Sequence, residues 1–429
     1  MDGDLTAAAS AQLGTAFHAP QVRLVTEAGA AISIGGQPVV PDIISATVTL
    51  SHTETGIVDI VMNNQRHGAD GRPVVPPWRY NKMETLSIGS RVRVDMRYGA
   101  DGWTPMILAR ITNMTFAFPS DSGAQITLKG EDLTSLLKTK PETDEMYTES
   151  HEIDIVERAL GRSGTGLTLP ATRPQPAFAA PLDGITHEKA KSYLEFFKGF
   201  AERMDYEIFV EFDDVAPGQA GAQMSAPDRR SVSFHFEPAR SGVLDALVSL
   251  HWGRDIIEFK PAFKAWDILT GARASGSVPR GRGTFEVAVP MSEAINDLHA
   301  SPGSARATPL NVASIREGIF ADETRPAVNE AAVQAVNIDQ ERARLQAVAK
   351  LRSSAREFLT AEMKTIGFTR LRPGIHVDLT GLYAPFDGIY YVTRTVHSLT
   401  AAGYLTTSTL RRPGMLDPAT YPDGGAREP

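Results

Sequence analysis

The stretch from Leu371 to Arg412, LRPGIHVDLTGLYAPFDGIYYVTRTVHSLTAAGYLTTSTLRR, decides how the rest of the chain is interpreted. Apolar and polar residues alternate in it over short runs, and glycine or proline separates the runs. This pattern is typical of consecutive β-strands. Its two histidines, His376 and His397, raise the question of whether the strands also form a catalytic site.

The same succession of patterns occurs once more, nearer the N-terminus. In both places a glycine turn, a strand, a long return strand and a closing strand follow in the same order. The turn and its alternate apolar positions are Gly89, Val92 and Val94 in the first copy, and Gly374, Val377 and Leu379 in the second. This order predicts two pseudo-equivalent small β-barrels in one chain, with chance similarity as the alternative because few residues are identical.

Strand, helix and loop patterns divide the chain into segments. Residues 1–20 are rich in Ala and Ser and are predicted to form a flexible arm, and residues 416–429 a C-terminal tail. The other predicted segments are a first β-barrel at 21–140, an α+β insert domain at 141–230, a second β-barrel at 231–270 and 366–415, and an inserted loop with an amphipathic helix at 271–365. The predicted fold class is therefore mainly β, with helical insertions.

A helix is expected from the helical spacing of Ile153, Val156 and Leu160, and two more helices are expected from longer apolar stripes. One contains the apolar stripe Tyr193, Phe197, Phe200, Ala201 and Met204. The other is predicted to run from Asp339 to Gly367, with Leu345, Val348, Leu351, Ala355, Phe358 and Leu359 on one face. Gly367 is the expected stop of this second helix, because glycine is common just beyond a helix end.

Composition excludes several classes of protein. The length of 429 residues predicts two or three domains. The absence of cysteine excludes disulfides, thiolate catalysis and cysteine-bound metals. A net charge of -8 argues against a dedicated nucleic-acid binder, which would be basic. Because no run of about 18 apolar residues occurs and the N-terminus is acidic, neither membrane insertion nor Sec export is expected.

The motifs of common active sites are absent. The sequence has no H-E-x-x-H pair and no G-x-S-x-G elbow. His376 and His397 occur in adjacent predicted strands and could approach each other, but surface or hydrogen-bonded structural roles are favoured. The glycine-rich stretch Gly161–Gly166 follows a helix instead of preceding one, so it is predicted to end that helix and not to bind phosphate.

Two charged groups leave alternatives open. Glu211, Asp213 and Asp214 could bind a cation, although a solvated turn is the favoured interpretation. Arg280 and Arg282 occur in a Gly-rich stretch that is predicted to be a surface loop. No catalytic, cofactor-binding or metal-binding residue is therefore predicted, and the chain is predicted not to be an enzyme.

The motifs together resemble the phage late control gene D family, the tail baseplate hub proteins of contractile phages and related injection systems. Residues 87–96 with 107–133 are similar to the family's first barrel, residues 192–212 to its insert and residues 371–412 to its closing strands, in the same order. Asp205 stands where the family often has glycine. The positions that match the family's closing motif are Pro373, Gly374, Val377, Leu379, Gly381, Phe386, Asp387, Gly388, Tyr390, Val392, Val396, His397, Tyr404 and Thr406.

The resemblance implies a structural role. In the family, three chains with two barrels each form a ring of six similar units, which adapts a sixfold tail tube to a threefold spike. The implied partners are further copies of the chain, the tail tube protein, a separate spike protein, other baseplate or wedge proteins, the tape-measure protein, and DNA that passes the lumen without specific binding. The implied location is the tail baseplate of a virion or injection particle, assembled in the bacterial cytoplasm.

Two other classes of function remain as alternatives. A cell-wall hydrolase at the tail tip would need paired carboxylates or a metal triad in a cleft between domains. A carbohydrate-binding β protein would need aromatic platforms on one face of a barrel, and the four tryptophans are scattered. The sequence does not distinguish a phage from a tailocin, a gene-transfer agent or an extracellular injection system.

Overall fold

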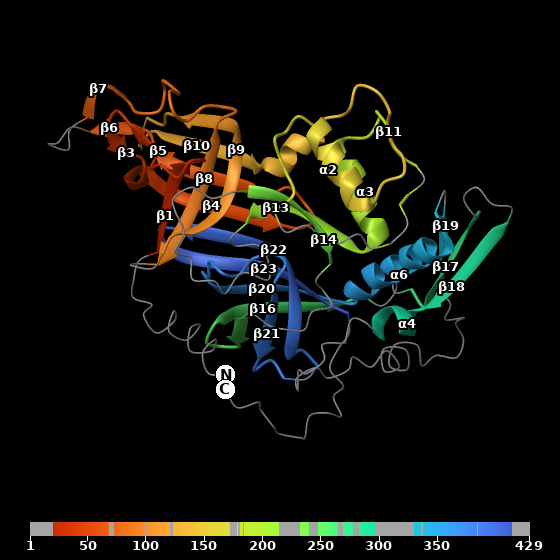
Figure 1. Ribbon diagram of the computed structural model, residues 1–429. Helices are drawn as coiled ribbons and strands as arrows, with labels where there is room; N and C mark the ends of the chain where they lie inside the picture. Colours follow the sequence, from red (N-terminus) through yellow and green to blue (C-terminus); the bar gives the residue numbers. More distant parts are fainter. Residues whose placement is uncertain are drawn as a thin grey trace.

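The computed structural model describes residues 20–413 except 68–72, 99–101, 121–122, 172–177, 179–180, 183, 214–231, 240–247, 265–268, 278–282, 297–329, 336–337 and 384. The first β unit, the second β unit and the insert lie next to one another (Figure 1). The predicted tail lies outside the described residues, as do residues 1–19 of the predicted arm. The last residue of that arm, Pro20, begins the first strand.

Six long strands build the first β unit, and shorter elements are attached to them. The long strands are β1 (Pro20–Thr26), β4 (Ile43–Ser51), β5 (Ile57–Asn63), β8 (Arg91–Tyr98), β9 (Thr104–Ala117) and β10 (Gln125–Asp132). The short elements are β2 (Ser33–Ile34), β3 (Gln37–Pro38), η1 (Val40–Asp42), β6 (Gln65–His67), β7 (Pro73–Trp78) and η2 (Leu133–Lys138). Alternate residues of the long strands, such as Val92 and Val94, are buried in one shared core.

The second β unit also has six strands. They are β15 (Val248–His251), β16 (Ile256–Phe263), β20 (Leu359–Ile366), β21 (His376–Thr380), β22 (Gly388–Thr400) and β23 (Gly403–Arg412). Their buried residues, including Val377, Leu379, Tyr390 and Val392, form a second core. Fully burying an aliphatic or aromatic side chain of this size contributes about 1.5–3 kcal/mol, so the closing stretch of the chain is central to this core.

The two units share one continuous twelve-stranded sheet. Strand neighbours follow the order β1-β8-β9-β10-β5-β4 in the first unit and β15-β21-β22-β23-β20-β16 in the second, so the two orders correspond strand by strand. One pair differs in direction, because β1 is antiparallel to β8 whereas β15 is parallel to β21. The mainly β fold is confirmed, and closure of each unit into a separate barrel stays a prediction.

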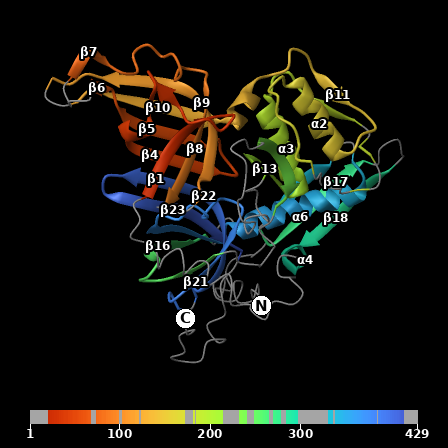
Figure 2. The ribbon, with the colours of Figure 1, turned by 60° about the vertical axis from the view of Figure 1, so that its left-hand side comes forward.

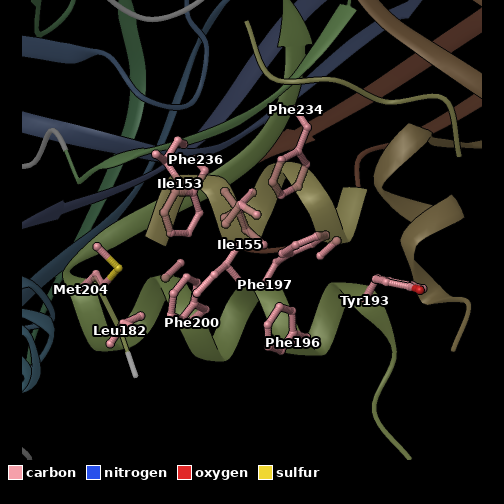
Figure 3. Packing of buried hydrophobic residues seen from close by; sticks show 14 of the residues in the cluster. Ile153, Ile155, Leu182, Tyr193, Phe196, Phe197, Phe200, Met204, Phe234 and Phe236 are labelled. Carbon is pink, nitrogen blue, oxygen red and sulfur yellow. The ribbon is translucent and has the colours of Figure 1, made fainter. Parts of the chain in front are cut away.

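The insert packs two helices on a small sheet beside the first unit (Figures 1 and 2). Its elements are β11 (Glu145–Tyr147), α2 (Glu152–Arg162), β12 (Ile185–His187), α3 (Tyr193–Met204), β13 (Tyr206–Phe212) and β14 (Val232–Pro238). Ser192 and Glu195 form a capping box at the start of α3. Phe197 and Phe200 of α3 face Phe234 and Phe236 of β14, as Figure 3 shows.

A third group of elements lies beside the insert, where the sequence predicted a loop and a helix. A three-stranded sheet contains β17 (Gly271–Ser277), β18 (Thr284–Pro290) and β19 (Glu330–Ala335), and α4 (Met291–Asn296) follows β18. Helix α6 (Gln340–Arg356) packs between this sheet and the insert (Figure 1). The predicted inserted loop is therefore partly a sheet, and Arg280 and Arg282 lie outside the described residues.

Two predicted boundaries are wrong. The predicted helix from Asp339 to Gly367 ends at Arg356, and strand β20 follows from Leu359. Alternate residues of Leu359–Ile366 are buried against the second unit, so the period changes from helix to strand. Strand β14, which was predicted to belong to the second unit, pairs with β13 of the insert. None of the described helices has the length and apolar composition of a bilayer-spanning helix.

Candidate functional site

The two glycine turns found in the sequence have the same geometry. Gly89 and Gly374 have φ angles of 91° and 86°, which favour glycine over residues with a Cβ atom. The amide of Gly89 donates to the carbonyl of Ile111 over 2.8 Å, and that of Gly374 to the carbonyl of Val392 over 2.9 Å. Each turn therefore joins the start of a strand to the middle of the long return strand.

Both long return strands also have a bulge at the same place. Pairing of β9 with β10 passes over Thr112, and pairing of β22 with β23 passes over Thr393. The hydroxyl of Thr112 donates to the carbonyl of Lys129 over 3.3 Å, and that of Thr393 to the carbonyl of Thr409 over 3.1 Å. Because a bulge fixes the register of its strand, Thr112 and Thr393 are equivalent residues of the two units.

The outer strands of the two units, β4 and β16, also have bulges at equivalent places. Pairing with the neighbouring strand passes over Ile44 in β4 and over Ile257 in β16. The glycine turns, the bulges and the strand order thus occur at equivalent places in both units. Chance similarity therefore does not explain the repeated sequence pattern.

The remaining motif residues lie around β21, β22 and β23. Pro373 precedes Gly374 in the turn, and Phe386 and Asp387 precede Gly388 at the start of β22. Asp387 accepts a hydrogen bond from the amide of Leu382 over 2.7 Å. The carbonyls of Pro385 and Asp387 accept bonds from the guanidinium of Arg412. These residues therefore hold the loop before β22 in place.

His397 is a buried structural residue. Its Nδ1 atom lies 2.7 Å from the hydroxyl of Tyr404, and its Nε2 atom lies 3.0 Å from the carbonyl of Leu371. Burial, assisted by the charge of Arg372, lowers the pKa of His397 to about 3. The neutral imidazole accepts from the tyrosine and donates to the carbonyl.

The second histidine of the closing stretch is far from the first. His376 lies opposite Tyr391 of β22, and Tyr391 precedes His397 by six residues on that strand. At about 3.3 Å per residue, this separates the two along the strand by roughly 20 Å. They do not form a joint site.

The junction between the two units is a strand pair inside the chain. Strand β4 of the first unit pairs with the second half of β22, from Leu399 opposite Ala46 to Arg394 opposite Ser51. The first half of β22 pairs with β21 of its own unit. One long strand thus belongs to both units, and the seam (defined as residues 46–51 with 394–399) makes the sheet continuous.

Buried charges attach the insert to this sheet. The carboxylate of Glu207 on β13 accepts bonds from the hydroxyl of Tyr391 and the guanidinium of Arg411, and lies near His52. Burial alone would raise the pKa of Glu207, but the neighbouring His52 and the charge of Arg411 lower it to about 2. Sequence reasoning missed these pairs because their members are far apart in the chain.

Asp205 ends helix α3 in the left-handed conformation, with a φ of 59°. This is a conformation that glycine and, to a lesser extent, Asp adopt, so the expected turn is present. Its carboxylate accepts bonds from Arg352 and Arg356 of α6. The side chain that replaces glycine here therefore connects the insert to α6.

Several residues of the candidate chemical sites have structural roles, whereas Asp213, which follows β13, has a buried carboxylate oxygen without a hydrogen-bond partner among the described residues. Glu211 binds Arg372, and Asp214 lies outside the described residues. Among the described residues, no three His, Asp or Glu side chains gather as a metal site. Gly164 and Gly166 take left-handed conformations directly after α2, as predicted for a helix terminator.

Two further polar features have partners within the chain. Burial raises the pKa of Asp132 to about 6, but this carboxylate accepts the amides of Gly56 and Thr134 and caps the turn η2. A groove of about 500 Å³ lies between α3, β13 and α6. Asp205 and Arg356, which line this groove, bind each other.

No protein-family model and no curated protein matches the sequence. Solved structures with the same fold exist. The tail protein from Neisseria meningitidis MC58 is 13% identical, with a TM-score of 0.60 over 94% of this chain and 100% of that chain. The 43 kDa tail protein of prophage MuSo2 from Shewanella oneidensis is 14% identical, with a TM-score of 0.57 over 92% of this chain and 99% of that chain.

Both similarities extend over nearly the whole of each chain, so they include the two β units and the insert together. This chain therefore has the fold of these solved tail proteins, one of which belongs to a prophage.

Proposed function

We propose that this chain is the structural baseplate hub of a contractile phage tail or of a phage-tail-like injection particle. Three copies would form a ring of six similar units that joins the sixfold tail tube to the threefold spike. The observation that carries this proposal is the seam, where two equivalent units are joined side by side through β4 and β22. Repeating such a head-to-tail contact generates a ring when its rotation closes.

The likeness to two tail proteins supports a place in a tail, and the roles of the buried polar groups support a structural role without catalysis. The proposed partners are further copies of this chain, the tube protein, a separate spike protein, other baseplate or wedge proteins and the tape-measure protein. The proposed location is the tail baseplate, after assembly in the host cytoplasm.

We also infer that the ring encloses a passage for DNA or the tape-measure protein, with an acidic or neutral wall. The net charge of -8 per chain supports this inference. A wall of Lys and Arg would bind DNA phosphates and hold the moving polyanion.

Electron microscopy of assembled particles tests the proposal. The expected result is a ring of three chains with six similar units around an open bore. A ring of six chains, a ring without a bore, or a bore lined mainly by Lys and Arg would contradict it. Binding of purified protein to peptidoglycan fragments, followed by their cleavage, would favour the hydrolase alternative.

A further inference from the structure

Each unit contains one long return strand and one outer strand, and the described residues show one pairing between a return strand and an outer strand. The seam uses the outer strand of the first unit, β4, and the return strand of the second, β22. The equivalent strands are β16 in the second unit and β9 in the first. Among the described strands, β16 pairs only with β20, and β8 pairs with β9 only up to Arg110. With respect to the described part of the chain, the outer side of β16 and the far half of β9, from Thr112 to Ala117, are therefore open edges.

The equivalent bulges transfer the register of the seam to these two edges. Thr393 corresponds to Thr112, so residues 394–399 correspond to 113–118. Ile44 corresponds to Ile257, so residues 46–51 correspond to 259–264. The transferred pairs are Asn113–Lys264, Met114–Phe263, Thr115–Ala262, Phe116–Pro261, Ala117–Lys260 and Phe118–Phe259.

The side chains of these pairs match face by face. On one face every pair is apolar, and Phe118 and Phe263 are 50% and 46% exposed in the single chain. On the other face the residues are small or polar, and two of the three pairs contain a lysine: Asn113 with Lys264, Thr115 with Ala262, and Ala117 with Lys260. In the seam inside the chain, the corresponding faces are buried at Val48 and His397 and half-buried at Thr49 and Val396. A slip of one residue would place apolar side chains opposite polar ones.

The geometry points to one occupant for these edges, a second copy of this chain. We propose that β16 pairs antiparallel with the far half of β9 of the next copy, in the register of the seam. This inference rests on the proposed ring and names the strands and residues that close it. The contact is head-to-tail, because a β16 edge of one copy meets a β9 edge of another and leaves its own β9 edge for a third.

The junction between chains differs from the seam at one position. The amide of His52 donates to the carbonyl of Thr393, so by alternation Val48 also directs its amide toward β22. Pro261 occupies the place of Val48 and has no amide hydrogen. The junction between chains therefore has one hydrogen bond fewer than the seam, and proline on this edge weakens pairing with unrelated strands.

Engineered disulfides test the register, and the chain has no cysteine of its own to interfere. The test variant is Thr115→Cys with Ala262→Cys, both exposed and in a pair without direct hydrogen bonds. Such pairs bring Cβ atoms to about 4.5–5.5 Å, close to the roughly 3.5–4.5 Å of a disulfide. The matched control is Asn113→Cys with Ala262→Cys, which lies on the same face but is displaced by two residues to about 7–8 Å.

A second control establishes that the geometry can be oxidised. Thr49→Cys with Val396→Cys is the equivalent pair inside one chain and should form a disulfide without joining chains. The full-length variants are oxidised over a series of protein concentrations and analysed by denaturing gels without reductant. The test variant is expected to form covalent species of two and three chains, at least tenfold more than the displaced pair.

The outcomes separate this inference from the proposed function. No linkage of Thr115→Cys/Ala262→Cys at any concentration, while the pair inside the chain forms, would overturn the inference. Equal linkage of the displaced pair would overturn it too. Linked species that stop at three chains support both the register and the ring. A ladder that continues beyond three chains would support the register and overturn the trimeric ring.

Discussion

The guanidinium of Arg372 lies against the carboxylate of Glu211, with 2.6 Å between Nη2 and Oε2. Arg372 precedes the glycine turn of the second unit, and Glu211 belongs to β13 of the insert. The same guanidinium donates to the carbonyls of Pro105 and Met106 on β9, each over 3.0 Å. One nearly buried side chain thus connects both β units and the insert.

Replacing Arg372 with alanine should lower the free energy of unfolding by about 3–5 kcal/mol, because it leaves a buried carboxylate and two carbonyls without their partner. Urea denaturation monitored by tryptophan fluorescence measures this loss. The double variant Arg372→Met/Glu211→Met should recover part of the lost stability, since neither charge of this buried ion pair then remains. A loss below about 1 kcal/mol for Arg372→Ala, which is typical of an exposed ion pair, would show that Arg372 is not a buried link.

We expect Asp205 to stabilise the folded protein more than a glycine at the same position would. Asp205→Gly relieves the left-handed backbone but leaves Arg352 and Arg356 without their carboxylate, so a net loss of about 2–4 kcal/mol is expected. Asp205→Asn retains the backbone preference and removes only the charge, and it serves as the matched control. Thermal unfolding of both variants measures the difference. Equal or higher stability of Asp205→Gly would mean that backbone strain outweighs the two ion pairs.

The pKa of His397 predicts a dependence of stability on pH. The folded pKa of about 3 lies below the ordinary value of 6.5, so the unfolded chain binds more protons between these values. Stability is fully present above pH 6.5 and falls by up to about 1.4 kcal/mol per pH unit as the pH decreases toward 3. His397→Gln should be less stable at pH 7 but should lose less stability between pH 6.5 and 4.5.

Urea denaturation of the parent and of His397→Gln at several pH values in this window checks the prediction. The comparison cancels other titrating groups, including Glu207, whose contribution is lost mainly between pH 4.5 and 2. Parallel stability curves for the two proteins would contradict a neutral, buried His397.

Features that neighbouring residues determine could be predicted from the sequence, whereas features that depend on residues far apart in the sequence could not. The turns at Gly89 and Gly374 were predictable because a local glycine and the alternation after it determine them. The end of α6 was not, because Leu351, Ala355 and Leu359 continue a helical stripe and only packing on the second unit selects a strand from Leu359 onward. Tertiary packing overrides the local pattern there.

The ion pairs of Arg372 and Asp205 could not be predicted, because the partners are far apart in the sequence. Arg372 and Glu211 are 161 residues apart, and Asp205 and Arg356 are 151 apart. No local spacing relates such residues, so sequence reasoning could propose Asp205 only as a departure at a turn and Glu211 only as a member of an acidic group. The order of equivalent strands in the two units could be predicted from the sequence. Which individual residues are equivalent could be determined only from the bulges in the structure.

Gly367 should not accept even a methyl group. A Cβ atom there would lie 2.1 Å from the ring of Tyr404, whose hydroxyl binds His397. Gly367→Ala is therefore expected to destabilise the protein by about 1–3 kcal/mol, as overpacking does. Gly199→Ala is the matched control, because it lies in α3 with open space at its Cβ position and should stabilise the helix by roughly 0.5–1 kcal/mol. Equal melting temperatures for the two variants would contradict this assignment.

Pro261 gives a test of the proposed junction that requires no cross-link. Pro261→Val restores the amide that Val48 supplies in the seam, and one added hydrogen bond contributes about 0.5–1.5 kcal/mol net. Self-association of the full chain should therefore become about twofold to tenfold tighter in sedimentation equilibrium. Pro38→Val, on a strand outside both open edges, is the matched control and should leave association unchanged. If both variants associate like the parent, or if both associate more tightly, the amide at position 261 does not face a neighbouring β9.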